Sequence, residues 1–90
     1  MRLYEMVAKR ESFDNIARVS RLSKNIDEKA DNGWTALMFA IDNNDANVVD
    51  TLIENGADVN FETPDGLTPL RFARMNGNEK IISLLLKAGA

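Results

Sequence analysis

The chain has 90 residues, of which 44% are hydrophobic and 28% charged, and its formal net charge is −3. These values suit one small globular domain, and the absence of cysteine excludes a disulfide framework and thiolate chemistry. The first ten residues alternate charged and apolar side chains, unlike a secretory signal or a membrane helix, so we expect the cytoplasm or another reducing compartment.

Residues 1–30 are predicted to form a degenerate first repeat of two helices. The first helix is expected on Leu3, Met6, Val7 and Arg10, and the second on Phe13, Ile16, Val19 and Leu22. A terminal repeat must present one polar face to water, so this loss of regularity is typical of an N-terminal capping repeat.

Residues 31–63 are predicted to form a full repeat, with a turn followed by two helices. Gly33 follows two polar residues, which indicates a tight turn with positive φ, and the Thr35 hydroxyl can cap the helix that follows. That helix is expected to end at Asn44, a residue type that tolerates the left-handed conformation. The second helix is expected on Val48, Val49, Leu52 and Ile53, with Leu52 and its counterpart Leu85 of the next repeat in the continuous core.

Residues 64–90 repeat this unit at a constant offset, which takes Gly33 to Gly66. Further pairs at the same offset are Thr35 and Thr68, Leu37 and Leu70, Phe39 and Phe72, Val48 and Ile81, and Leu52 and Leu85. Pro69 suits a first helical position, where its missing N–H is not needed. Because Arg71 and Arg74 replace apolar or small residues, we expect a C-terminal capping repeat with both arginines in solvent, and a monomer when unbound.

Two motifs carry a resemblance to a known family: Gly-Leu-Thr-Pro-Leu-Arg-Phe-Ala at 66–73 and Leu-Ile-Glu-Asn-Gly-Ala-Asp-Val-Asn at 52–60. With this constant offset between copies, they resemble the ankyrin repeat. The resemblance implies an all-α solenoid of three helix-turn-helix repeats with hairpin-like turns, spanning residues 1–90. Met38 and Arg71 stand where the family usually has histidine, and Ala36 replaces proline, which weakens the histidine-mediated tie between neighbouring repeats.

No group of residues has the pattern of a catalytic or metal site. Asp42 to Asp45 resemble the start of a calcium loop, but Ala46 occupies the fifth ligand position and Ile53 stands where the bidentate glutamate belongs. We therefore expect no enzyme activity, no metal and no cofactor. An acidic chain without a basic stripe also argues against nucleic acid, and we expect no membrane partner.

The acidic charge is concentrated in the middle repeat, which has seven Asp or Glu residues and no Lys or Arg. One interpretation is a surface that attracts a basic partner. The alternative is a solvated face with ion pairs between repeats, since Arg21, Glu54 and Lys87 occupy equivalent positions in the three repeats. Asp31, Asp42 and other turn acids would still be free for a partner.

The resemblance implies partner binding through the turn tips and the exposed side of the first helices. The expected contact residues are Asp31, Asn32, Trp34, Met38, Asp42, Asn43, Asp65, Leu67, Arg71 and Met75. Trp34 is expected to be the main anchor, because aromatic residues are enriched at interface hot spots. The alternative is that Trp34 packs over the first repeat as part of the cap. For Met38 and Met75, the alternative is that they fill gaps in the core.

The sequence thus predicts a non-catalytic module that binds one protein partner. One form of this function is that of an inhibitor or immunity-type protein. The alternative is a structural fragment of a larger repeat protein, or a designed array without a natural partner.

Overall fold

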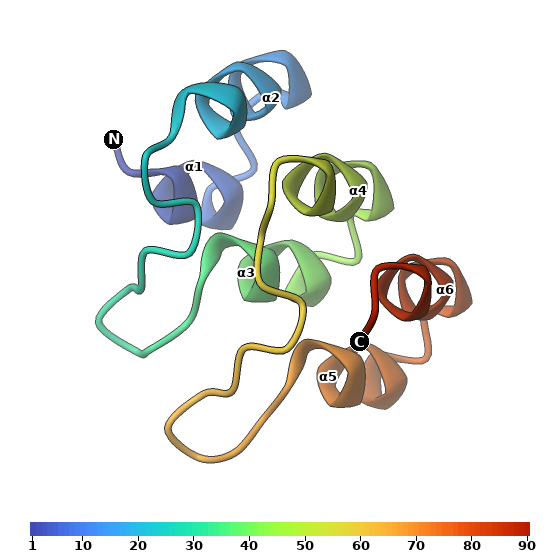
Figure 1. The fold of residues 1–90 in the computed structure, drawn as a ribbon. Coiled ribbons are helices and arrows are strands. Elements are labelled where there is room, and N and C mark those ends of the chain that lie inside the picture. Colours follow the sequence, from blue (N-terminus) through green and yellow to red (C-terminus); the bar gives the residue numbers. More distant parts are fainter.

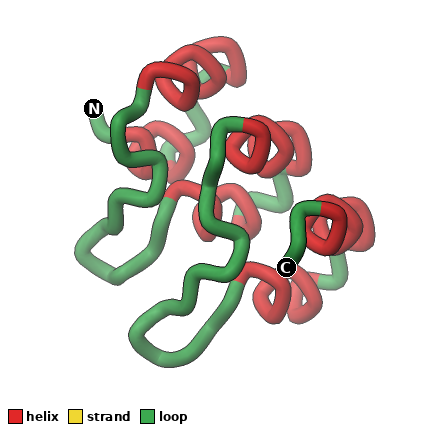
Figure 2. The backbone as a smooth tube through the Cα atoms, in the orientation of Figure 1, coloured by secondary structure: helices red, strands yellow, loops and turns green.

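The computed structural model describes all of residues 1–90 and contains six α-helices and no strand. The helices are α1 (Leu3–Ala8), α2 (Phe13–Leu22), α3 (Ala36–Asp42), α4 (Ala46–Glu54), α5 (Pro69–Asn76) and α6 (Glu79–Lys87). Figure 1 shows two layers, with α1, α3 and α5 in one and α2, α4 and α6 in the other. Two long loops project on one side (Figure 2). The predicted all-α solenoid of three helix-turn-helix repeats is confirmed.

Local signals begin and end most helices. The first turns of α2, α4, α5 and α6 are capped by the side chains of Ser12, Asp45, Thr68 and Asn78, each of which accepts a backbone N–H. Asn44 and Gly77 end the first helices in the left-handed conformation, with φ of 55° and 73°. Thr35 differs from the prediction, because its hydroxyl caps nothing and its Oγ1 is buried without a hydrogen-bond partner.

The first helix of the first repeat is displaced by one residue from the offset that relates the other repeats. Just after α3, the N–H of Asp45 donates to the carbonyl of Ala40 at 3.1 Å, and the side chain of Asp45 also caps α4. In the first repeat these two roles fall on different residues. Glu11 donates to the carbonyl of Met6 at 2.9 Å, and the next residue, Ser12, caps α2. One extra residue therefore lies between α1 and α2. The offset that relates the other repeats applies to the first repeat from α2 onward, and α1 is shifted from it by one residue.

Three residues of the first repeat differ from the prediction, because Arg10 was expected within the first helix and Phe13 and Leu22 on the apolar side of the second. Arg10 follows α1 in the link to α2, where it has a φ of 58°. Phe13 and Leu22 begin and end α2 with 45% and 74% of their surface exposed. Instead, α2 buries Ile16 and Ser20, and the Ser20 hydroxyl donates to the Ile16 carbonyl at 2.7 Å.

The buried apolar side chains form one core of 18 residues, and ten of these belong to the middle repeat. The reason is its position, since α3 packs against both α1 and α5, and α4 packs against both α2 and α6. Leu52 of α4 and Leu85 of α6 lie in this core, as predicted, without exposed surface. None of the six helices is long and apolar enough to cross a membrane.

Asparagine side chains tie neighbouring first helices together. The Nδ2 of Asn43 donates to the carbonyl of Val7 at 2.9 Å, and the Nδ2 of Asn76 donates to the carbonyl of Ile41 at 3.2 Å. Asn43 and Asn76 are equivalent in the repeat, so both interfaces between first helices use the same bond. A side-chain tie between repeats is thus present although Met38 and Arg71 replace the expected histidines.

Leu52→Ala should reduce the free energy of unfolding by about 2 to 5 kcal/mol, because it removes buried methyl groups from the layer that both neighbours pack against. For a small domain this is a large share of a total of about 5 to 15 kcal/mol. Urea denaturation followed by circular dichroism measures the loss. Leu22→Ala is the control, since its exposed side chain should change stability by less than about 0.5 kcal/mol. Equal midpoints for the Leu52 variant and the parent would contradict the prediction.

Thr35→Val and Thr68→Val should change stability in opposite directions. An unpaired buried hydroxyl costs about 1 to 3 kcal/mol, so replacing that of Thr35 by a methyl group should raise the free energy of unfolding by about 1 kcal/mol. The Thr68 hydroxyl accepts the N–H of Arg71 at 3.3 Å, and its loss should cost about 0.5 to 2 kcal/mol. The same denaturation experiment compares the pair, and a loss of stability in both would show that the Thr35 hydroxyl has a partner in solution.

Candidate binding surface

The two long loops end in tight turns at the predicted positions. In the first turn the N–H of Ala30 donates to the carbonyl of Trp34 at 2.8 Å, and in the second the N–H of Thr63 donates to the carbonyl of Leu67 at 2.9 Å. Gly33, with a φ of 83°, closes the first turn in a conformation that other residues rarely adopt. Backbone hydrogen bonds therefore fix the direction in which each turn projects.

Contacts between the loops make them one continuous edge. A Cβ at Gly33 would lie 2.8 Å from the Cδ of Pro64, so the second turn packs directly on the first. Farther from the tips, the carboxylate of Asp27 accepts the N–H of Asp58 at 2.9 Å. In addition, the Nζ of Lys29 lies 5.1 Å from the centre of the Phe61 ring, which is a cation-π distance.

An aromatic cluster connects the first helices beside this edge. The ring of Trp34 lies 5.2 Å from that of Phe39 on α3 and 5.3 Å from that of Phe72 on α5, and Tyr4 of α1 stacks on Phe39 at 6.4 Å. Trp34, Phe39 and Tyr4 are half-buried. The cluster was not predicted from the sequence, because spacing alone places Trp34 in a turn and does not show which rings it reaches.

The structure separates the predicted contact residues by exposure. The exposed ones are Asp31, Asn32, Asp42, Asp65, Arg71 and Met75, and the half-buried ones are Trp34, Asn43 and Leu67. Met38 has no exposed surface, so its inclusion among the contact residues is wrong. Met38 lies on α3, which packs between α1 and α5, and its thioether fills the core there.

Two of the half-buried residues also have structural contacts. The amide nitrogen of Asn43 is occupied by the carbonyl of Val7, so Asn43 helps to hold two repeats together. The aromatic contacts of Trp34 are with its own repeat and the third repeat, and they do not involve an aromatic ring of the first. These ring contacts therefore differ from the alternative in which Trp34 packs over the first repeat as part of the cap.

The charged groups of the middle repeat have no ion-pair partners. The chain has one ion pair, between Arg2 and Glu28 within the first repeat. Glu54 is exposed and forms no ion pair with its counterparts on α2 and α6, so the expected ion pairs between repeats do not form. The carboxylates of Asp31 and Asp42 are exposed, and neither takes part in an ion pair or in one of the hydrogen bonds within the chain.

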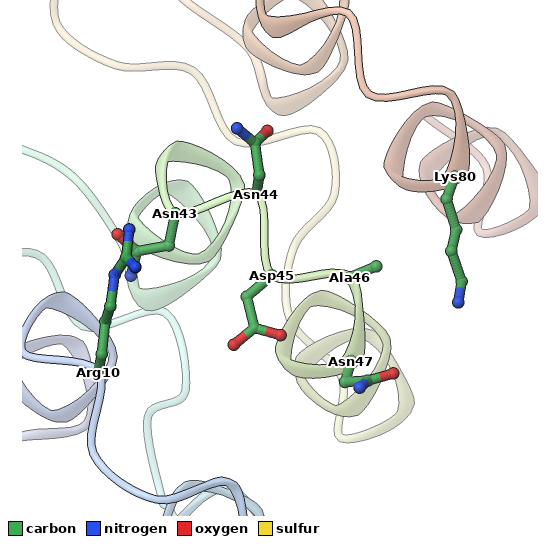
Figure 3. Close-up of a pocket in the computed structure, with 7 residues that line it drawn as sticks. All are labelled: Arg10, Asn43, Asn44, Asp45, Ala46, Asn47 and Lys80. Atoms are coloured by element: carbon green, nitrogen blue, oxygen red, sulfur yellow. The ribbon is translucent and has the colours of Figure 1, made fainter.

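A polar hollow of about 330 Å³ lies at the links between first and second helices. Figure 3 shows the residues that line it, which are Arg10, Asn43, Asn44, Asp45, Ala46, Asn47 and Lys80. Asp45 caps α4 by accepting the N–H of Val48 at 3.3 Å, so the segment that resembled a calcium loop links two helices. No three Asp or Glu side chains are placed so that together they could hold a metal ion.

The chain matches one family model and is similar in sequence to several known proteins. The family model described as "Ankyrin repeats (3 copies)" matches residues 5–90. The chain is 36% identical to the inactive serine/threonine-protein kinase TEX14 of Bos taurus over 97% of its own length and 6% of the relative's. It is 39% identical to the putative ankyrin repeat protein YahD of Escherichia coli over 73% of its length and 35% of the relative's. It is 44% identical to the human 2-5A-dependent ribonuclease over 60% of its length and 7% of the relative's.

Trp34→Ala should reduce the free energy of unfolding by about 1 to 3 kcal/mol, because two aromatic pairs of about 0.5 to 1.5 kcal/mol each are lost. Trp34→Phe, which keeps a ring at the position, should lose less than half as much. Urea denaturation followed by circular dichroism compares the two variants. If both variants were as stable as the parent, the ring contacts of Trp34 would contribute nothing to folding.

Proposed function

Because the chain belongs to the ankyrin repeat family, we propose that it is a non-catalytic module that binds one protein partner through its turn tips and the adjoining first-helix face. Ankyrin repeats are generally protein-protein interaction modules, and the family is generally non-catalytic. The chain spans between 6% and 35% of the length of the relatives named above, so their activities are not carried over.

The observation that supports this proposal best is the exposed acidic edge of the middle repeat. Asp31 and Asp42 lie at the turn tip and at the end of α3, and both carboxylates are exposed and unpaired. No lysine or arginine of the middle repeat offsets them. The turn that carries Asp31 is fixed by the contact between Gly33 and Pro64, and Asp42 lies on the adjoining first helix, so little conformational entropy is lost on binding. This arrangement suits a partner with a basic surface.

The apolar part of the proposed surface comes from Trp34, Leu67 and Met75. Trp34 and Leu67 follow the two turn glycines at equivalent positions and are half-buried, whereas Met75 is 73% exposed. A half-buried aromatic ring supported by neighbouring rings can provide contact area without losing much side-chain freedom. We therefore propose Trp34 as the anchor and the acidic turns as the groups that attract the partner.

Inhibition by covering the partner's active surface is one form of the proposed function. The alternative is a section of a longer repeat protein, which is favoured by the small share of each relative that the chain spans. Neither form requires a cofactor, nucleic acid or membrane. The cytoplasmic location and the monomeric state stay predictions.

Asp31→Asn combined with Asp42→Asn should slow association with the partner about tenfold at low salt and flatten its salt dependence, with a smaller effect on dissociation. Affinity capture from the source cell extract identifies the partner, and surface plasmon resonance then measures both rates.

Asp14→Asn combined with Glu54→Gln is the matched control, because it removes the same charge at exposed positions on the second helices. If this control slowed association as much as the turn variant, general charge attraction would explain the result. A larger effect of the control would instead place the partner on the second helices.

A further inference from the structure

The outer face of the third repeat differs from the equivalent face of the middle repeat. In the middle repeat, Leu37, Met38, Ile41 and Val49 are at most 1% exposed, because the layer of α5 and α6 packs on one side of α3 and α4. The equivalent residues of the third repeat are Leu70, Arg71, Arg74 and Ile82. Both arginines are exposed, as predicted, and Leu70 and Ile82 are half-buried, since no helix packs on the far side of α5 and α6.

Apolar side chains remain on this face although the two arginines interrupt it. Ile82 and Leu86 are separated by one turn of α6 and lie on the same side of the helix, and Leu86 is 47% exposed. A face adapted only to water would have polar residues at these positions as well. The third repeat therefore offers apolar surface and guanidinium groups together.

The positive charge of this face is not neutralised within the chain. Arg71 and Arg74 on α5 are exposed, and neither of them forms an ion pair. The only hydrogen bond of these two side chains is from Arg71 to the carbonyl of Gly66, at 3.4 Å. Residues 64–90 contain four basic and two acidic residues, so the local charge is positive.

We propose that the outer face of α5 and α6, formed by Leu70, Arg71, Arg74, Ile82 and Leu86, is a second docking surface that binds an acidic amphipathic helix of another protein. The equivalent face of the middle repeat is covered by helices that lie alongside it, so a helix fits the same geometry. Its apolar side would cover Ile82 and Leu86, and its carboxylates would pair with the two guanidinium groups, which suit bidentate contacts.

A second copy of this chain suits the face less well. Head-to-tail stacking would place the third repeat of one copy against the first repeat of another. Residues 1–30 contain seven basic and five acidic residues, so two positively charged ends would meet. The charge of the two ends thus favours a different, acidic partner. This inference is independent of the surface on the turn edge.

The test is a titration of the ¹⁵N-labelled 90-residue chain with two model helical peptides, followed by NMR. Both peptides carry leucine at positions i, i+3, i+4 and i+7; one has glutamate and the other lysine at the flanking positions. Saturable shifts of α5 and α6 amides are expected with the glutamate peptide only. Arg71→Glu combined with Arg74→Glu should weaken binding at least about tenfold, and Leu86→Gln should weaken it several-fold without changing the charge.

Arg18→Glu combined with Arg21→Glu is the matched control, since both residues are exposed on α2 and the change in charge is the same. It should leave the peptide affinity within about twofold, because the middle repeat lies between α2 and the docked helix, and salt at 0.1 M screens charges that are farther apart than about 10 Å. Circular dichroism confirms that each variant is folded. Equal binding of both peptides, shifts confined to the turns, no shifts at all, or self-association of the chain through Leu86 in sedimentation would each overturn the proposal.

Discussion

Packing between neighbouring helix pairs is the interaction on which this structure depends. Each pair has two short helices of six to ten residues, too short to be stable alone in water, so an adjacent pair must cover its apolar side. The middle pair is covered on both sides and contributes ten of the 18 core residues. The terminal pairs are covered on one side, which explains why Phe13, Leu22 and Leu86 keep exposed apolar surface.

The same packing determines how the candidate binding surface is built. Stacking the repeats brings Pro64 onto Gly33 and the N–H of Asp58 onto Asp27, so the loops support each other. The acidic turn residues project from this edge into water, where screening keeps their mutual repulsion small. A partner that replaced this water would remove the screening. The positive charges of the partner would then attract the acidic turn residues more strongly than they do in water.

Charge divides the surface of the molecule into regions with different chemistry. The turn edge and the middle repeat are acidic, whereas the outer face of α5 and α6 is basic around an apolar strip. Both surfaces use α5, which contains Met75 of the first surface and Leu70, Arg71 and Arg74 of the second; the first also includes the loops and α3, and the second includes α6 (Figure 1). Because the two surfaces attract opposite charges, they favour partners with different chemistry.

The sequence by itself determined the repeat architecture, because helix period, turn glycines and capping residues are local signals. They predicted six helices, the turns before Trp34 and Leu67, and the burial of Leu52. Tertiary contacts decided the rest. The extra residue before Ser12 has no local signature, and the burial of Met38 depends on two neighbouring layers. The rings around Trp34 and the absence of ion pairs between Glu54 and its counterparts likewise depend on how residues far apart in the chain meet, which spacing alone does not specify.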